Sequence, residues 1–231
     1  MKILNIESAT SICSVAISES GEVRYQAQTD APYQHTSQIT LLIEECAKKS
    51  GLSLEELDGV AVSMGPGSYT ALRVGLSTAK GICFALQKPL IGVSTLKALA
   101  QGVKSTLGEK SDLVNTLICP MIDARRMEVY TTLYDADLEA QGVDEAKIID
   151  ENSYQPFFEL GKKIIFTGDG SEKCKAVIHH THALFDNGVA SASNMVPLAE
   201  DAFKRKNFLD VAYAEPFYLK PPNITTPKKL L

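Results

Sequence analysis

The amino-acid sequence predicts an α/β fold built from two similar lobes. Short apolar segments of strand length alternate with longer segments of helical periodicity over the first hundred residues. The opening pattern then returns near residue 116, as an apolar strand, a polar turn with an acidic residue and an alternating strand. Residues 104–115 are polar and contain Gly108, so we expect an N-terminal lobe over residues 1–104 and a C-terminal lobe over 105–231.

Composition narrows the class of protein. The 231 residues are 45% hydrophobic and 22% charged, which predicts an ample core and no extended disorder. The net charge of −5, with only short basic clusters, argues against nucleic-acid binding by the chain alone. No apolar run approaches the roughly 20 residues that span a bilayer, and no secretory leader is visible. We therefore expect a cytoplasmic protein with no membrane partner, whose five scattered cysteines are buried reduced thiols.

The first lobe opens with three predicted strands, over residues 2–7, 12–17 and 22–28. Residues 37–50 then show helical periodicity, and Gly51 ends this helix. Ser53 to Glu56 has the pattern of a capping box, and it leads into a strand over residues 59–63. The apolar face of the helix consists of Ile39, Leu42, Ile43, Cys46 and Ala47.

A Gly65-Pro66-Gly67 turn joins that strand to a helix over residues 69–86. The two glycines allow dihedral angles that a β-carbon would forbid, so another group can approach the backbone closely. That group is either a phosphate or a protein partner. Ala71, Gly75 and Ala79 form a ridge of small residues on the helix, along which a second helix could pack.

The rest of the chain follows the same alternation. We expect a strand over residues 89–93, a helix capped by Ser94, and second-lobe strands over 116–122, 127–134 and 164–167. A late helix over 194–206 has Pro197 near its first position. Four further prolines then indicate an irregular tail: Pro216, Pro221, Pro222 and Pro227.

Polar residues at strand ends are the main candidates for ligand binding. Glu7 ends the first strand beside Ser8 and Thr10, where a carboxylate and two hydroxyls could meet the metal and phosphates of a nucleotide. The same residues are more often found at a solvated strand end with turn-capping hydroxyls. Asp123 is open in the same way: it could bind a cation, cap the turn or pair with Arg125.

Other catalytic patterns are weak. His179, His180 and His182 crowd together, but tetrahedral metal sites generally draw ligands from two separated segments. The glycine turn matches neither a Walker loop nor the G-x-S-x-G nucleophile elbow. We therefore expect no catalytic residue and no metal site.

Several segments together resemble the TsaB (YeaZ) family, with landmarks from residue 1 to about 219. They are Ile3-Leu4-Asn5-Ile6-Glu7-Ser8-Ala9-Thr10, Gly65-Pro66-Gly67-Ser68-Tyr69-Thr70 with Arg73-Val74-Gly75, Gly92-Val93-Ser94-Thr95-Leu96, Ile122-Asp123-Ala124-Arg125 and Ala214-Glu215-Pro216-Phe217-Tyr218-Leu219.

The resemblance implies the two duplicated lobes of the actin, sugar-kinase and Hsp70-ATPase (ASKHA) superfamily. It also implies a part in making threonylcarbamoyladenosine next to the anticodon of tRNA. In that pathway the family is a scaffold that pairs with its catalytic paralogue TsaD, together with the ATPase TsaE. Contact with tRNA is expected only through the complex, and the isolated chain is expected to form a homodimer.

One comparison separates scaffold from enzyme. The catalytic paralogue binds a metal through a His-x-x-x-His pair, and this chain has Thr95 and Leu99 at the matching positions. A hydroxyl and an isobutyl group do not replace two nitrogen ligands, so no metal is expected. No cofactor is expected for the chain alone, although ATP within the complex remains open. The residues for it are Glu7, where many members have aspartate, with Ser8, Thr10, Asp123 and Gly168.

The resemblance also implies a partner surface, in which the helices over 37–50 and 69–86 pack against the same pair of a second subunit. We expect the contact to include Ile39, Leu42, Ile43, Cys46, Ala71, Gly75, Thr78, Ala79 and Ile82, although one face of the first helix must also cover its own sheet. Two alternatives remain open. One is an autonomous ATP-binding enzyme of the same superfamily, and the other is a glycoprotease-like peptidase.

Overall fold

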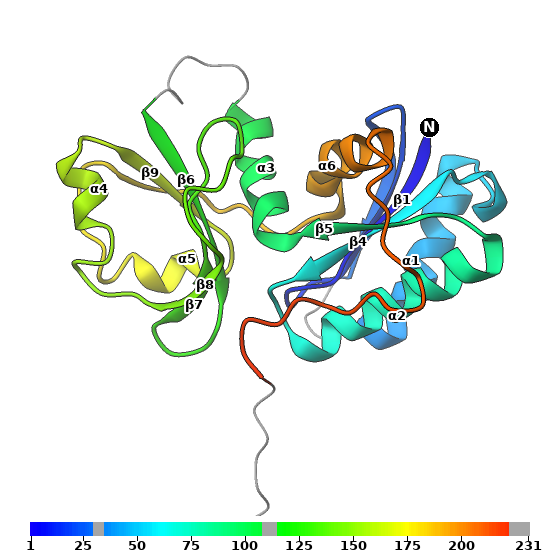
Figure 1. The fold of residues 1–231 in the computed structure, drawn as a ribbon, viewed down its shortest axis with the longest axis horizontal. Helices are drawn as coiled ribbons and strands as arrows, with labels where there is room; N and C mark the ends of the chain where they lie inside the picture. The colour runs from blue at the N-terminus through cyan, green and yellow to red at the C-terminus, as the bar shows by residue number, and fades with distance from the viewer. Residues whose placement is uncertain (30–34, 108–114, 222–231) are drawn as a thin grey trace, which may run out of the picture.

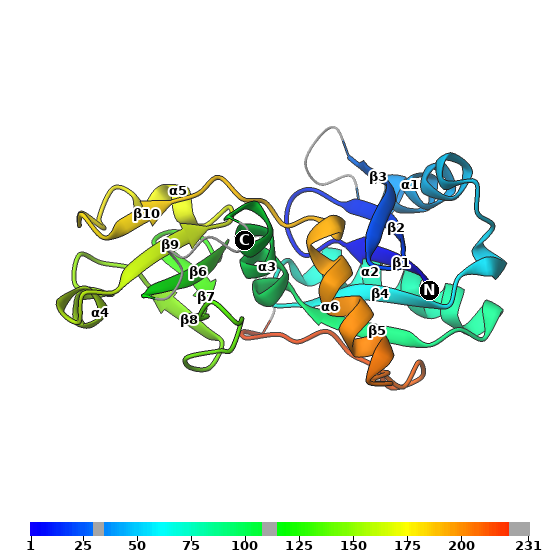
Figure 2. The same ribbon diagram turned by 90° about the horizontal axis from the view of Figure 1, so that it is seen from above.

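The computed structural model describes residues 1–29, 35–107 and 115–221, and shows two lobes side by side (Figures 1 and 2). Each lobe contains a five-stranded mixed sheet, in the order β3-β2-β1-β4-β5 in the first and β10-β9-β6-β7-β8 in the second. In both, the central strand pairs antiparallel with the next strand and parallel with a later one. The second order is the first read in reverse, so the predicted fold of two similar α/β lobes is confirmed.

The first lobe is built from the elements up to α3. Its strands are β1 (Lys2–Glu7), β2 (Ser14–Glu19), β3 (Glu22–Gln28), β4 (Gly59–Gly65) and β5 (Leu90–Ser94). Its helices are α1 (His35–Ser50), the short 3₁₀ helix Leu54–Glu56, α2 (Tyr69–Leu86) and α3 (Thr95–Leu107). Ser94 caps α3 as expected, because its Oγ accepts a hydrogen bond from the amide of Lys97 at 3.3 Å.

The second lobe has shorter elements. Its strands are β6 (Thr116–Asp123), β7 (Glu128–Thr131), β8 (Glu145–Ile148), β9 (Lys163–Thr167) and β10 (Ala183–Phe185). Its helices are α4 (Gln155–Glu159) and α5 (Ser171–Cys174). The last described helix, α6 (Ala192–Lys204), packs on the first lobe. The expected lobe boundary falls partly on residues 108–114, and Pro222 and Pro227 of the expected tail follow residue 221; these positions lie outside the described residues.

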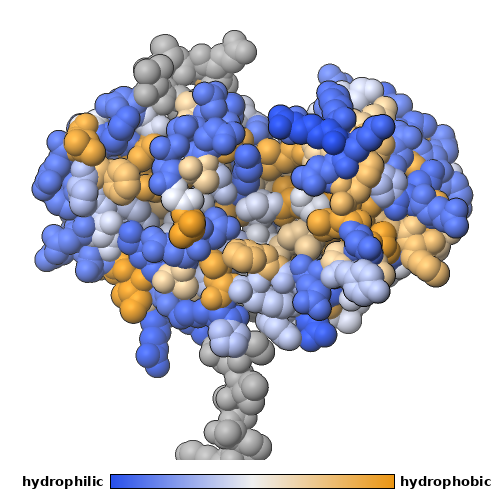
Figure 3. All heavy atoms as spheres, viewed as in Figure 1, coloured by the Kyte–Doolittle hydropathy of each residue, from blue (hydrophilic) through white to orange (hydrophobic). Residues whose placement is uncertain are grey.

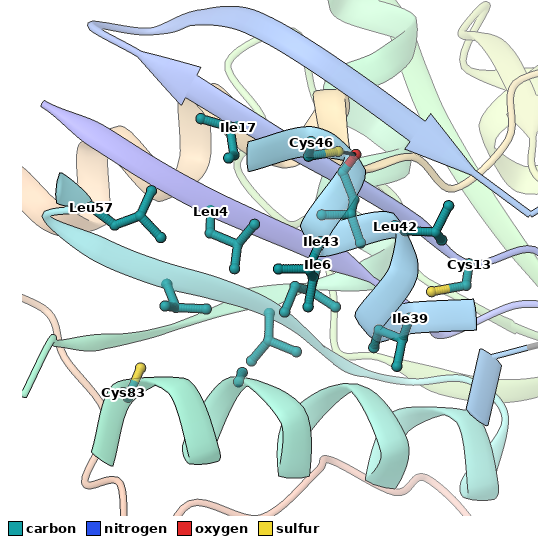
Figure 4. Close-up of a cluster of buried hydrophobic side chains, with 14 of the residues drawn as sticks. Leu4, Ile6, Cys13, Ile17, Ile39, Leu42, Ile43, Cys46, Leu57 and Cys83 are labelled. Atoms are coloured by element: carbon teal, nitrogen blue, oxygen red, sulfur yellow. Dashed lines mark hydrogen bonds between the residues drawn. The ribbon is translucent and has the colours of Figure 1, made fainter. Parts of the chain in front are cut away.

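Helices cover both faces of the first sheet. α1 and α2 pack on one face, and α6 packs on the other against β1 and β5, so the chain returns from the second lobe to the first (Figure 1). The core between α1, α2 and the sheet contains Leu4, Ile6, Ile43 and Cys46, which point toward one another in Figure 4. Pro197 lies inside α6 rather than near its first position, because the helix begins two residues earlier than predicted.

The five cysteines are buried and free, as predicted from their spacing. Burial raises the pKa of the Cys13 thiol to about 12 and that of Cys119 to about 11, so the reactive thiolate is scarce at neutral pH. We expect all five to react with a thiol reagent only after unfolding. A colorimetric thiol titration in buffer and in guanidinium chloride measures this, and rapid labelling of the folded protein would contradict it.

The surface carries no single large apolar area in the view of Figure 3, where hydrophobic and hydrophilic residues alternate in small patches. Among the described residues, no helix has the length and apolar character that crossing a membrane requires.

Candidate functional site

A cleft of about 490 Å³ lies between the two lobes. The turns after β1, β4, β6 and β9, with Tyr130 of β7 and residues 218–221, form its walls, which therefore come from both lobes. The lining residues are Ala9, Thr10, Ser11, Gly67, Ser68, Tyr69, Thr70, Ile122, Asp123, Ala124, Arg125, Tyr130, Asp169, Tyr218, Leu219, Lys220 and Pro221. Most of the lining groups are hydroxyls or charged side chains, so the cleft suits a polar ligand.

The Gly-Pro-Gly turn is packed against other parts of the same chain. Gly65 has φ +109°, and a β-carbon there would overlap the carbonyl oxygen of Phe217. A β-carbon at Gly67 would overlap the carbonyl oxygen of Ala9, and the amide of Ser68 donates to that oxygen at 2.7 Å. The close approach predicted for this turn is thus made to the turn after β1 and to the C-terminal segment.

Glu7 and Ser8 lie behind the wall of the cleft, contrary to the expectation that they face a nucleotide. Both are fully buried, and Glu7 accepts a hydrogen bond from the amide of Ala9 at 2.7 Å. Burial raises the pKa of Glu7 from 4.5 to about 7. Ser8 packs against Gly75 of α2. Neither side chain reaches the cleft, because the chain turns at Ala9 before it enters the lining.

Thr10 and Asp123 do line the cleft, as the nucleotide hypothesis requires. Asp123 is already engaged, since its Oδ1 pairs with the ammonium of Lys173 and accepts the amide of Arg125 at 2.9 Å. Its own amide donates to the carboxylate of Asp169 at 3.0 Å. These bonds engage Oδ1 of Asp123 and hold the turn after β6 in shape.

Gly168 is not part of the lining, and its neighbour Asp169 takes that place. Gly168 has φ +100° and packs against the carbonyl of Met121. Burial is the main cause that raises the pKa of Asp169. An acidic residue two positions after an apolar strand was the available signal for Asp169. Tyr218 was marked only as part of the family-like segment 214–219, and Lys220 was not marked; both join the site through the path of the C-terminal segment.

Thr95 and Leu99, at the positions compared with the paralogue's histidines, are both buried at the start of α3. Leu99 packs in a core with Ile118 and Ile122. Within the described residues, no group of three or more His, Cys, Asp or Glu side chains has the geometry of a metal site.

The histidine cluster lies elsewhere in the second lobe. The ring of His180 stacks on Phe158 with centroids 4.2 Å apart, and its Nδ1 accepts the amide of His182 at 3.1 Å. None of His179, His180 and His182 lines the cleft. These contacts are local packing within the lobe.

The apolar residues of α1 face the interior. Ile39, Leu42, Ile43 and Cys46 are all buried in the first core, and Figure 4 shows them pointing at the sheet. They therefore serve the chain's own fold, and a partner can reach only the opposite side of α1. Leu41 lies on that side and is 54% exposed.

The small-residue ridge of α2 also faces inward, which corrects the sequence interpretation. Ala71, Gly75 and Ala79 are buried, and Gly75 packs against Ser8 and Val62. The ridge lets α2 lie close to its own sheet. Of the other predicted contact residues, Thr78 and Ile82 are half-buried, at the border of the outer face.

A second stripe of small residues lies on the outer face of α2. Ser77, Gly81 and Ala85 are exposed and repeat every four residues, so they share one side of the helix. A β-carbon at Gly81 would meet nothing within 4 Å. Phe84 flanks the stripe with 82% of its surface exposed. α1 and α2 lie side by side at this face (Figure 1).

Comparison with known proteins gives consistent results. Residues 28–214 match the family described as TsaD, tRNA N6-adenosine threonylcarbamoyltransferase. The chain is 31% identical over 230 residues, 95% of both chains, to the tRNA threonylcarbamoyladenosine biosynthesis protein TsaB of Escherichia coli K12. A crystal structure of a Pseudomonas aeruginosa protein with similarity to peptidase YEAZ aligns with TM-score 0.80 and 24% identity, over 95% of this chain and 99% of that one.

A more distant structure has the same fold. The activator of 2-hydroxyisocaproyl-CoA dehydratase from Clostridium difficile, with bound ADPNP, aligns with TM-score 0.51 and 10% identity, over 90% of this chain and 96% of that one. At this identity the match concerns the fold alone, and it agrees with two α/β lobes.

Proposed function

The chain belongs to the TsaB family of tRNA threonylcarbamoyladenosine biosynthesis proteins, and we propose that it is the non-catalytic subunit that binds and organises TsaD. The match of residues 28–214 to the TsaD family supports this, because it makes the two proteins paralogues of one fold. Paralogous subunits often associate through equivalent surfaces, as copies of one chain do in a two-fold dimer. Alone, the chain would use the same surface to form a homodimer.

The observation that carries the proposal is the outer face of α2. Ser77, Gly81 and Ala85 present almost no side-chain bulk, so a helix of the partner can approach the backbone closely. Phe84 beside this stripe and Leu41 on the exposed side of α1 are large apolar side chains, which a partner covering both helices would bury. Association through α1 and α2 thus remains our proposal, with the contact moved to the outward residues.

A scaffold role is also supported at α3. Threonine and leucine occupy the two positions at which the resemblance places metal-binding histidines in TsaD, and both side chains are packed in the interior. We propose that catalysis and tRNA contact belong to the complex with TsaD and TsaE. Reconstitution tests this: the chain alone should not modify tRNA. Addition of TsaD, TsaE and TsaC, which the resemblance implies supplies threonylcarbamoyl-adenylate, should restore the modification.

ATP binding by the chain itself is a second candidate, which the position of Thr10 and Asp123 in the cleft favours. Calorimetry with ATP and Mg²⁺ separates the two. Micromolar affinity would support an autonomous nucleotide-binding protein, whereas absence of heat would favour the scaffold.

The outer face of α2 can be tested with Gly81→Leu. A β-carbon at this exposed position meets no atom of the folded chain within 4 Å, so we expect the protein to fold normally. It would stand between α2 and a partner helix, and we expect association with TsaD to weaken at least about tenfold, the equivalent of roughly 1.4 kcal/mol. Titration calorimetry or co-purification measures this.

Gly142→Leu is the matched control, because a β-carbon at Gly142 also meets nothing within 4 Å and the residue lies in the other lobe. It should leave the affinity unchanged. If Gly81→Leu and the original chain bound TsaD with equal affinity, the outer face of α2 would not be part of the interface.

A further inference from the structure

The chain after α6 forms a C-terminal strap, residues 207–221, that runs from the first lobe to the second (Figure 1). Its first half is bound to the first lobe. The amide of Leu209 donates to the carbonyl of Leu90 at 2.8 Å. The ammonium of Lys80 on α2 donates to the carbonyls of Ala212 and Ala214, at 3.0 and 3.1 Å. These contacts fix the path of the strap along α2.

The strap leaves the first lobe at the Gly65-Pro66-Gly67 turn, against which its backbone packs. The amide of Phe217 donates to the carbonyl of Met64 at 2.7 Å. The next residue of the turn, Gly65, has no side chain, and any β-carbon there would overlap the carbonyl of Phe217. The absence of a side chain thus lets two backbone segments lie in direct contact beside the cleft.

The last residues of the strap connect both lobes. The ring of Tyr218 stacks on Tyr69, at the start of α2, with centroids 4.5 Å apart. Two residues later, the ammonium of Lys220 lies 2.5 Å from each carboxylate oxygen of Glu128 on β7 of the second lobe. Tyr218, Leu219, Lys220 and Pro221 all line the cleft, so the strap forms one of its walls.

We propose that the strap is a latch that holds the lobes together across the cleft and sets how far the cleft opens. α3 and the segment before α6 also connect the lobes, but they do so through the covalent chain and its core packing. The latch contacts are a ring stack and a partly exposed ion pair, which break at small cost compared with core contacts. The lobes can therefore separate at the strap while both cores stay folded.

Two pairs of variants test the latch in the full chain. Lys220→Ala removes the ion pair with Glu128, whereas Lys220→Arg keeps it. Tyr218→Ala removes the stack on Tyr69, whereas Tyr218→Phe keeps it. The phenylalanine loses no hydrogen bond, because the Tyr218 hydroxyl has no partner among the described residues. Hydrogen exchange of backbone amides in residues 66–73 and 122–131 reports on both walls of the cleft. We expect about two- to fivefold faster exchange in each alanine variant and unchanged exchange in the conservative ones.

A distance measurement supplies the second readout. Spin labels at Glu22→Cys and Leu160→Cys sit on exposed positions of the two lobes, away from the outer face of α2, and the five native thiols are buried. In the Lys220→Ala, Tyr218→Ala double variant, the interlobe distance distribution should broaden toward longer values. A distribution and exchange rates identical to those of the original chain would overturn the latch.

Discussion

Gly75→Leu is expected to lower the free energy of unfolding by about 3 kcal/mol, because it forces a large side chain between α2 and its own sheet. A β-carbon at Gly75 already overlaps the hydroxyl of Ser8, and its next neighbour is Val62 on β4. Ser8 is buried, and its amide is tied to the hydroxyl of Ser63 at 3.1 Å, so the backbone on that side has little room to move. Urea denaturation followed by circular dichroism measures the loss.

The same experiment distinguishes the inner and outer faces of α2. Gly81 lies six residues after Gly75, on the exposed face of α2. Gly81→Leu should leave the free energy of unfolding unchanged or raise it by about 0.5–1 kcal/mol, because glycine is a poor helix former. Gly75→Leu would then weaken association with TsaD only because it destabilises the folded chain. If Gly75→Leu were as stable as the original chain but failed to bind TsaD, the ridge would be at the interface after all.

Elements with strong periodicity were predictable from the sequence. α2 was expected over residues 69–86 and has those bounds, because an apolar stripe and the flanking glycine turn both define it. β8, α4, α5 and β10 were not predicted. They have three to five residues each, and β8 is largely exposed, so no apolar alternation marks it. Such segments take their form from neighbouring strands rather than from their own pattern.

The direction of the small-residue ridge shows where sequence reasoning failed. A stripe of small residues predicts close packing but does not say against what, and Gly75 packs on its own sheet. Leu72, Leu76 and Cys83 are buried on the same side of α2 as Ala79, which was the available signal for the inward side. The cleft was predictable only in part: Thr10 and Asp123 follow strand ends, whereas Tyr218 and Lys220 arrive from a segment with no regular structure.

Glu7 should make the protein less stable as the pH rises from about 4.5 to 7. Its pKa is raised from 4.5 to about 7 by burial, so over this range the unfolded chain loses the proton while the folded chain keeps it. The unfolded state then binds fewer protons, and the free energy of unfolding falls with pH. At about 1.4 kcal/mol per pKa unit, the loss amounts to roughly 3 kcal/mol and is complete above pH 7.

Glu7→Gln removes this titration while keeping nearly the same shape. We expect the stability of the variant relative to the original chain to increase by roughly 3 kcal/mol between pH 4.5 and 8, measured by denaturant unfolding at closely spaced pH values. Glu56→Gln is the contrasting control. The amide of Ser53 and the ammonium of Lys2 lower the pKa of Glu56, so its effect has the opposite sign and changes only below about pH 4.5.

The pKa of Glu7 also bears on nucleotide binding. A buried carboxyl that holds its proton up to about pH 7 is a poor ligand for Mg²⁺, since the neutral form offers the cation no charge. A role for Glu7 at the metal of a nucleotide would require it to be ionised in the folded chain. Parallel stability curves of the original chain and Glu7→Gln across this pH range would show that ionisation and reopen the nucleotide hypothesis. Curves that diverge would leave Glu7 as a structural acid behind the wall of the cleft.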